Sequence, residues 1–300
     1  MERKFVYYID KENDNKIIEQ FLKEQGFTHH ALVTIKRTDH GILRNGTWEY
    51  INQRLHLNDE LVILLRENEQ SEHVVPVELD LDIQYEDEDI LVVNKPANMP
   101  IHPSINNYEN TLANAIGYYY NKQGIPFVFR CVNRLDRDTT GLTIIAKHSL
   151  SAGILSQMVS KREIKRTYIA ICSGKVESEG TIHAPIGRVC DSTILRQVDF
   201  ENGEDAITHY KRLQYDKEKN LSLVKINLLT GRTHQIRVHM KYIGHPLIGD
   251  FLYNEDYTYM NRQALHSYSL DFLHPITKEK MDFTSELFPD MKSIFQSIEL

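Results

Sequence analysis

The sequence predicts an α+β protein that consists of a small N-terminal domain and a larger second domain. Short β-prone runs are interspersed with a few segments whose apolar residues recur at helical spacing. Of the 300 residues, 41% are hydrophobic, which is enough for a core on any architecture. Ten acidic residues and no Lys or Arg fall between positions 67 and 89. We therefore predict domains at 1–70 and 85–300, joined by an acidic linker at 71–84.

Residues 1–70 are predicted to contain two short helices, a tight turn and a small hairpin. The expected elements are a strand at 5–9, helices around 17–22 and 31–35, an Asn-Gly turn at 45–46 and a strand at 62–65. This order resembles the alpha-L RNA-binding domain, a small module first named from a ribosomal protein. Asn58 stands where that domain usually has Gly, and Asn tolerates the same left-handed backbone. A small α+β appendage without RNA contact is the alternative that the residues leave open.

The second domain is predicted to begin with a buried strand at 90–93, which ends before Pro96. A helix is expected to start at 111–116, followed by a helix at 150–159 and a strand at 167–172. A further helix is predicted from Thr233, its expected N-cap, to Gly244, its expected stop.

The bulk composition excludes several classes of protein. No run approaches the roughly eighteen apolar residues of a membrane span. The N-terminus has no apolar signal segment followed by a cleavage site. The three cysteines cannot all pair and form no CxxC motif, which favours a reducing compartment and argues against structural zinc. We therefore expect a cytoplasmic protein with no metal and no membrane partner.

Charge is distributed unevenly along the chain. The net charge is −7, but it would be positive without the ten acids between positions 67 and 89. Between Arg130 and Tyr168 there are eight basic and three acidic residues. A basic surface outside the acidic stretch is therefore compatible with the composition, as a nucleic-acid partner requires.

A charged run, Asn133–Gly141, lies between the apolar Val132 and a β-prone run at 142–146. Loops attached to rigid strands often carry catalytic groups, although most charged loops are solvated turns with local ion pairs. Two Asp and two Arg interleave within five residues of this run, which makes it the first candidate for a site.

Three separated motifs, within residues 80 to 290, resemble those of the RluA/RluD-type pseudouridine synthases. They are NRLDRDTTG at 133–141, KRTYIAICSG at 165–174, and TGRTHQIRVHM at 230–240 followed by GHPLIGDFLY at 244–253. The matches depart from the family in detail, because Asn133 replaces a common His and Arg166 replaces a Lys. Members of the RluD branch often carry an alpha-L domain ahead of the catalytic domain, in the place predicted here for residues 1–70.

The resemblance implies a catalytic domain with a mixed, mainly antiparallel central sheet. It also implies an enzyme that isomerises uridine to pseudouridine in structured RNA, above all in large-subunit (23S-type) ribosomal RNA. By the same resemblance Asp136 is the catalytic carboxylate, Tyr168 lies over the target base and Arg237 pairs with Asp136. No cofactor is expected, because breaking a glycosidic bond and rejoining the ring through carbon needs no electron or group carrier.

The expected chemistry explains why these residue types are needed. Burial disfavours an ionised carboxylate, and the charge-assisted hydrogen bonds of an Arg such as Arg237 counter that effect. An extruded base loses a few kcal/mol of stacking, and an aromatic ring such as Tyr168 returns about 1–3 kcal/mol of it. The Tyr168 hydroxyl is also a candidate to assist proton removal. Whether Asp136 attacks the sugar or the base stays open.

RNA is the expected partner of a chain that we expect to be monomeric. Candidate RNA contacts, which position rather than specify, are Arg134, Arg137, Lys165, Arg166 and Arg232. One alternative is a catalytically silent RNA-binding or ribosome-assembly module, and the joint presence of Asp136, Tyr168 and Arg237 argues against it. A glycosidase that uses Asp136 and Asp138 is disfavoured, because residues two apart on a strand point to opposite faces.

Overall fold

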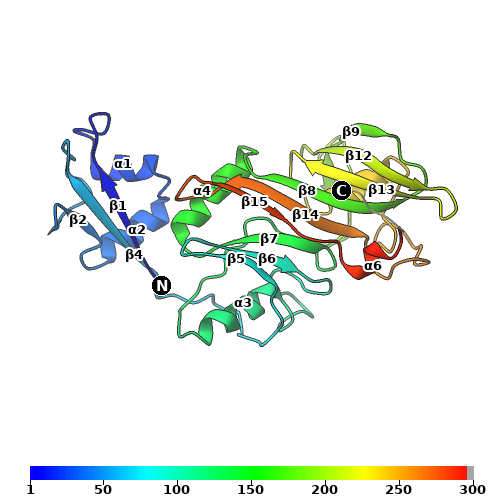
Figure 1. Ribbon diagram of the computed structural model, residues 1–300, viewed down its shortest axis with the longest axis horizontal. Coiled ribbons are helices and arrows are strands. Elements are labelled where there is room, and N and C mark those ends of the chain that lie inside the picture. Colours follow the sequence, from blue (N-terminus) through cyan, green and yellow to red (C-terminus); the bar gives the residue numbers. More distant parts are fainter. Residues whose placement is uncertain (296–300) are drawn as a thin grey trace. The chain divides into compact units, whose positions relative to one another are not determined.

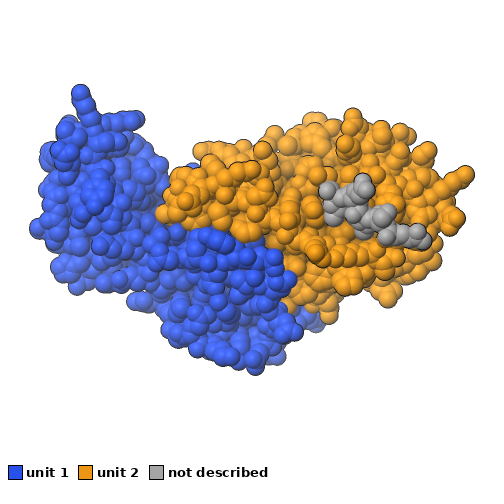
Figure 2. Space-filling model, in the orientation of Figure 1, with its two compact units in different colours: residues 1–92, 102–132, 144–160 blue, residues 93–101, 133–143, 161–300 orange. Residues whose placement is uncertain are grey.

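The computed structural model describes residues 1–295 and divides into two compact units (Figure 2). Unit 1 contains residues 1–92, 102–132 and 144–160, and unit 2 contains residues 93–101, 133–143 and 161–300. Strands β6 (Ile90–Lys95) and β7 (Thr140–Ala146) each have residues in both units. The sequence predicted domains at 1–70 and 85–300. These bounds differ from those of the two compact units, and the predicted domains stay a prediction.

The N-terminal part of unit 1 is a four-stranded antiparallel sheet with two helices (Figure 1). Its strands follow the order β1 (Glu2–Tyr8), β4 (Glu60–Arg66), β2 (Ile42–Arg44) and β3 (Thr47–Trp48). Strand β1 alternates, so that Phe5 is buried while its neighbours on both sides are exposed or half-buried. The helices α1 (Ile18–Glu24) and α2 (His29–Arg37) occupy the two predicted positions.

Local sequence explains the ends of these elements. Thr28 caps α2, because its Oγ1 accepts a hydrogen bond from the Ala31 N–H at 3.2 Å. The hairpin between β2 and β3 turns through Asn45 and Gly46, both with positive φ. Asn58 has a φ of 68°, the left-handed conformation that the sequence required at this turn. The predicted order of elements is present, while the alpha-L resemblance and its RNA contact stay predictions.

The rest of unit 1 contains strand β5, parts of β6 and β7, and two helices. Strand β5 (Ile83–Glu86) precedes β6, and the sheet order continues to β7. Helix α3 (Leu112–Asn121) begins with a capping box, in which Thr111 and Asn114 bond each other's backbone N–H. Helix α4 (Ser149–Ser160) matches the helix predicted at 150–159.

Unit 2 is organised around a mixed, mainly antiparallel sheet, as the family resemblance implied. The strands β7, β14, β8, β13, β12 and β9 are neighbours in this order, and β15 pairs with β14. Only the β7–β14 pair among them is parallel. The bounds are β8 (Lys165–Ser173), β9 (Glu179–His183), β12 (Ile207–Asp216), β13 (Leu221–Leu228), β14 (Leu265–Leu273) and β15 (Lys280–Thr284).

Two helices and a small hairpin complete the described part of unit 2. The hairpin pairs β10 (Ile186–Arg188) with β11 (Arg196–Val198), and α5 (Gln235–Tyr242) lies against β11 and β12. A buried cluster that includes Ile171, Leu223 and Met291 joins the sheet to α6 (Pro289–Lys292). Every described helix falls short of the length and hydrophobicity that a membrane crossing needs.

Candidate active site

The charged run singled out in the sequence forms a loop that leads into β7. Its first residue, Asn133, is buried, and its Nδ2 donates to the Leu142 carbonyl at 3.1 Å. Thr143 Oγ1 returns a hydrogen bond to the Asn133 carbonyl at 2.9 Å. These two bonds close the base of the loop, so the residue that departs from the family motif braces the loop through both its side chain and its main chain.

Polar groups from two other segments, residues 95–99 and Arg262, hold the loop backbone. The fully buried Lys95 donates from Nζ to the Arg137 carbonyl at 2.9 Å, and the Met99 N–H donates to the same oxygen at 3.1 Å. Arg262 Nη1 donates to the Asp138 carbonyl at 3.1 Å. All three bonds fix the loop, and the first also gives the buried Lys95 one of the strong partners that it needs.

A glycine sets the point at which the loop joins the sheet. Gly141 has a φ of 106°, and a Cβ there would lie 2.3 Å from the Ser267 carbonyl oxygen. It pairs with Ser267 of β14, which in turn pairs with Tyr168 of β8. Only glycine allows this close approach, and the three residues form one row across three strands. Tyr168 is buried in this row.

Asp136 lies in the loop with a side chain that is 27% exposed. Its Oδ2 accepts a hydrogen bond of 2.8 Å from Nη1 of Arg237, so the predicted contact between the two residues is present. His234 Nε2 lies 3.9 Å from the same oxygen. Among the described residues no group donates a hydrogen bond to Oδ1 of Asp136. One carboxylate oxygen is therefore held and the other is left for a substrate.

A second carboxylate binds the edge of the Arg237 guanidinium that does not contact Asp136. Asp250 is fully buried and accepts hydrogen bonds of 2.7 Å from Nε and from Nη2 of Arg237. Its Oδ1 also accepts the Leu252 N–H at 3.1 Å. The guanidinium thus uses one edge for Asp250 and its remaining nitrogen for Asp136. Such a bidentate pair fixes the orientation of Arg237 as well as its charge.

Aromatic rings enclose the guanidinium. The Cζ of Arg237 lies 5.1 Å from the ring centre of Tyr253 and 5.6 Å from that of Phe251. Burial acts to lower the pKa of Arg237, but the hydrogen bonds and negative charges of Asp250 and Asp136 outweigh it and raise that pKa above its ordinary value. Arg237 therefore stays charged although only 2% of its side chain is exposed.

The start of α5 differs from the prediction. Thr233 is not the N-cap, because that position is His234, with a φ of 57° and no side-chain capping bond. The side chain of Gln235 instead holds the segment before the helix, because its Oε1 accepts the Arg232 N–H at 3.0 Å and the Thr230 hydroxyl at 2.8 Å. The prediction of Thr233 was wrong because the chain turns once more, through the left-handed His234, before α5 begins.

The five predicted RNA contacts have different surroundings. Arg134 and Lys165 are exposed and form no ion pair with a described residue. Arg137 forms an ion pair with Asp138, and Arg232 forms one with Glu204. Arg166 is half-buried and its Nη2 lies 3.5 Å from the Thr230 carbonyl. Their roles in RNA binding stay predictions.

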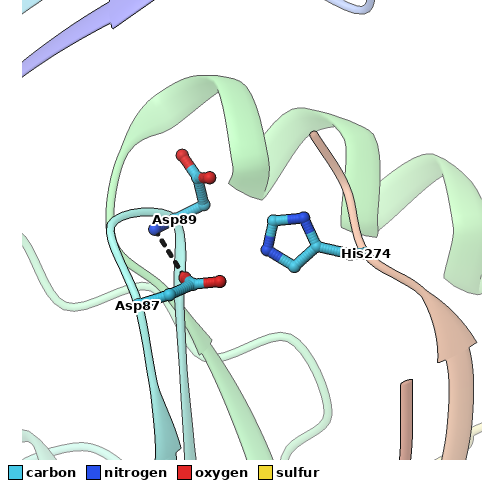
Figure 3. A group of neighbouring side chains, drawn as sticks. All are labelled: Asp87, Asp89 and His274. Carbon is cyan, nitrogen blue, oxygen red and sulfur yellow. Dashed lines mark hydrogen bonds between the residues drawn. The ribbon is translucent and has the colours of Figure 1, made fainter. Parts of the chain in front are cut away.

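Figure 3 draws Asp87, Asp89 and His274, and the two aspartates belong to unit 1, whereas His274 belongs to unit 2. The Asp89 N–H donates to Asp87 Oδ1 at 2.8 Å. Asp89 Oδ1 is also bonded by Arg3 and by His148, each at 2.8 Å. Because local donors within unit 1 already use these oxygens, we assign no metal ion to the two aspartates.

Comparison with known proteins decides the family. The family model described as RNA pseudouridylate synthase matches residues 89–242, which is more than half of the chain and includes Asp136, Tyr168 and Arg237. The chain belongs to the RNA pseudouridylate synthase family. Together with relatives named as ribosomal large subunit pseudouridine synthase D, this confirms the RluA/RluD-type resemblance and the prediction of an RNA pseudouridine synthase, which is an isomerase.

Relatives of this synthase match it over most of its length. YjbO of Bacillus subtilis (strain 168), an "Uncharacterized RNA pseudouridine synthase", is 38% identical over 93% of this chain and 98% of its own. "Ribosomal large subunit pseudouridine synthase D" of Zymomonas mobilis is 40% identical over 75% of each chain. The solved structure of "Human RNA Pseudouridylate Synthase Domain Containing 1" has a TM-score of 0.59 and 27% identity, and it covers 71% of this chain and 87% of that one.

Sequence reasoning missed several residues around Asp136 of the synthase. Asp250, Phe251 and Tyr253 lie in the quoted GHPLIGDFLY segment, but only their side-chain geometry shows that they enclose Arg237. His234 was also missed, although it lies inside the third motif. Asp250 is identified by its burial next to Arg237 of α5. That proximity can be seen only in the folded structure.

Proposed function

We propose that this protein isomerises specific uridines of large-subunit ribosomal RNA to pseudouridine, with Asp136 as the catalytic carboxylate and without a cofactor. The observation that carries the proposal is the asymmetry of Asp136. Its Oδ2 is held at 2.8 Å by a buried, doubly bonded Arg237, while its Oδ1 has no donor among the described residues. Several relatives are named as ribosomal large-subunit enzymes, which supports that RNA as the substrate.

The chemistry needs an ionised carboxylate that can act as nucleophile or base. Arg237 supplies the compensating positive charge. Its two hydrogen bonds to Asp250 keep the guanidinium in place when the substrate binds. The glycosidic bond of the target uridine breaks, the ring turns, and the new bond forms to carbon. We assign to Tyr168 the contact with the target base, and to its hydroxyl assistance in removing the proton at that carbon.

RNA binding in this proposal depends on the surface around the loop. Arg134 and Lys165 are free to meet phosphates, while Arg137, Arg166 and Arg232 would exchange or share their present partners. We further propose that residues 1–70 form an RNA-binding domain joined through 71–84, and that the protein acts as a cytoplasmic monomer. These contacts position the RNA, while Asp136, held by Arg237, performs the reaction.

Tritium release from RNA labelled with 5-³H-uridine tests the proposal. The wild type should release tritium from large-subunit ribosomal RNA, and Asp136→Asn should lose about 10⁴-fold or more in rate while it still binds the RNA. Asp138→Asn is the matched control, because its Oδ1 can still accept the Asn98 N–H. Binding without any release by the wild type would instead support the silent RNA-binding module.

A further inference from the structure

His234 occupies an unusual backbone position for a buried residue. Its φ of 57° and ψ of 19° are left-handed, directly before α5, and its side chain is only 12% exposed. A left-handed conformation costs a non-glycine residue about 1–2 kcal/mol. Such strain persists where the surroundings demand it and is concentrated at functional sites. The contacts of the imidazole ring show which side-chain position this backbone conformation supports.

The hydrogen bonds of Tyr253 define the protonation of this ring. The Tyr253 hydroxyl oxygen accepts the Arg196 N–H at 3.0 Å and lies 2.9 Å from Nδ1 of His234. No other acceptor for the hydroxyl proton is found among the described residues. Tyr253 therefore donates to Nδ1, and a neutral imidazole whose Nδ1 accepts carries its own proton on Nε2.

The protonated nitrogen faces the proposed catalytic carboxylate. Nε2 of His234 lies 3.9 Å from Oδ2 of Asp136, the oxygen that Arg237 also holds. This separation exceeds a hydrogen bond. Catalytic hydrogen bonds in unliganded enzymes are often long and tighten only when the substrate is bound.

We propose that His234 is a positioning residue, which presents a neutral Nε2–H to Oδ2 of Asp136. Together with Arg237 it selects which carboxylate oxygen is held and so leaves Oδ1 directed at the substrate. The proposal rests on the proposed catalytic role of Asp136. It assigns no bond chemistry to His234 itself.

The electrostatic surroundings favour the neutral ring. Burial lowers the pKa of His234, and it outweighs Asp136 and Asp250, which raise that pKa; Arg237 and Arg196 lower it further. Since the shift is downward from 6.5, the ring is neutral at and above pH 6.5. Protonation would place a hydrogen on Nδ1, against the hydroxyl proton of Tyr253, and would add a second positive charge beside Asp136.

A histidine within α5 shows what a purely structural role looks like. His239 is buried, and both of its nitrogens have partners at 2.9 Å, the Thr208 hydroxyl and the Ala184 carbonyl. Burial lowers its pKa as well. His234 differs because only one nitrogen is satisfied by the fold and the other faces Asp136. His239→Gln is therefore the matched control.

Three substitutions at position 234 test the assignment through tritium release by the full-length protein. His234→Ala should lower kcat about tenfold to a hundredfold, as expected for one hydrogen bond to a charged group, with little change in KM. His234→Gln should keep most of the rate, because its amide N–H replaces Nε2–H. His234→Asn, whose amide matches Nδ1 instead, should behave like His234→Ala. Equal losses in all three variants, or a wild-type rate in His234→Ala, would overturn the proposal.

The pH dependence gives a second readout. The wild-type kcat should fall on the acid side, below pH 6.5, as His234 becomes protonated, and this step should be absent in His234→Gln and present in His239→Gln. An acid limb that is unchanged in His234→Gln would contradict the role of His234.

Nitrogen-15 NMR of the imidazoles separates this inference from the proposed function. At neutral pH the full-length wild type should show His234 as the neutral tautomer with its proton on Nε2, whether or not it releases tritium. A proton on Nδ1, or a charged ring, would refute the inference. Retained tritium release by Asp136→Asn would instead refute the proposed function, so the two failures are distinguishable.

Discussion

Two buried arginines in unit 2 hold the Asp136 loop with the same arrangement of hydrogen bonds but at different atoms. Each forms a bidentate pair with an aspartate, Arg237 with Asp250 and Arg262 with Asp290. Each then donates from Nη1 to the loop. Arg237 reaches the carboxylate of Asp136 at 2.8 Å, whereas Arg262 reaches the main-chain carbonyl of Asp138 at 3.1 Å.

The partner aspartates differ in their access to solvent. Asp250 is fully buried, while 45% of the Asp290 side chain is exposed. Arg262 is also bonded to the carbonyls of Gln263 and Leu265, at 3.1 and 3.5 Å, so its charge is used mainly on backbone oxygens. The comparison indicates that Arg237 determines the charge of the site and that Arg262 determines the shape of the loop.

The largest effect is expected for Arg237→Met. This change leaves Asp136 and Asp250 without their cation, and breaking a buried ion pair costs about 3–5 kcal/mol of stability. The loss of one preorganised donor to a reacting group should lower kcat about 10²–10³-fold. Denaturant unfolding and single-turnover tritium release measure the two effects.

Arg237→Lys provides the control for this prediction. A Lys keeps the charge but cannot make the bidentate contact with Asp250 and reach Asp136 as well. Its rate should lie between those of the wild type and Arg237→Met. If Arg237→Met turned over at the wild-type rate, Arg237 would not be the residue that determines the charge of the site.

Arg262→Met should have a smaller effect of a different kind. It removes a charged donor from the Asp138 carbonyl, which costs about 1.5–3 kcal/mol of stability. Misplacement of a catalytic group by about 1 Å lowers activity by up to a hundredfold. The characteristic sign should be faster hydrogen exchange at the Thr139 amide, which is bonded to the Asp136 carbonyl at 3.1 Å.

The same exchange measurement on Arg237→Met tests the division of roles. Arg262 is assigned to the loop backbone and Arg237 to the Asp136 carboxylate. The Thr139 amide should therefore exchange faster in Arg262→Met than in Arg237→Met, when the two are compared under conditions of equal unfolding free energy. Equal exchange in the two variants would mean that both arginines support the loop in the same way.

Short-range features of this molecule could be predicted from the sequence. The spacing of Ala31, Leu32 and Ile35 predicted α2, and the turn residues Asn45 and Gly46 predicted the first hairpin. The contact between Arg237 and Asp136 was predicted too, but only through the resemblance of two motifs 101 residues apart in the chain. Periodicity alone contains no information about that pair.

The remaining contacts depend on how distant segments meet. Lys95 bonds a carbonyl 42 residues away, and Arg262 bonds one 124 residues away, so neither partner can be inferred from local pattern. The wrong choice of Thr233 as N-cap has a related cause. Local rules favoured a hydroxyl there, but Gln235 binds the Arg232 N–H before the helix, and the left-handed His234 takes the N-cap position.

The smallest effect is expected for Asp290→Asn, compared with Asp250→Asn. Asp290 is half exposed, so solvent screens its pair with Arg262, and the loss of such a charge costs about 0–1 kcal/mol. The amide can also keep the bond from the Met291 N–H, now at 2.8 Å. Asp250→Asn leaves Arg237 with one carboxylate in a buried setting and should cost about 3–5 kcal/mol. Equal unfolding free energies for the two variants would show that burial does not distinguish the two arginines, because the chemical change is identical and only the exposure of the aspartate differs.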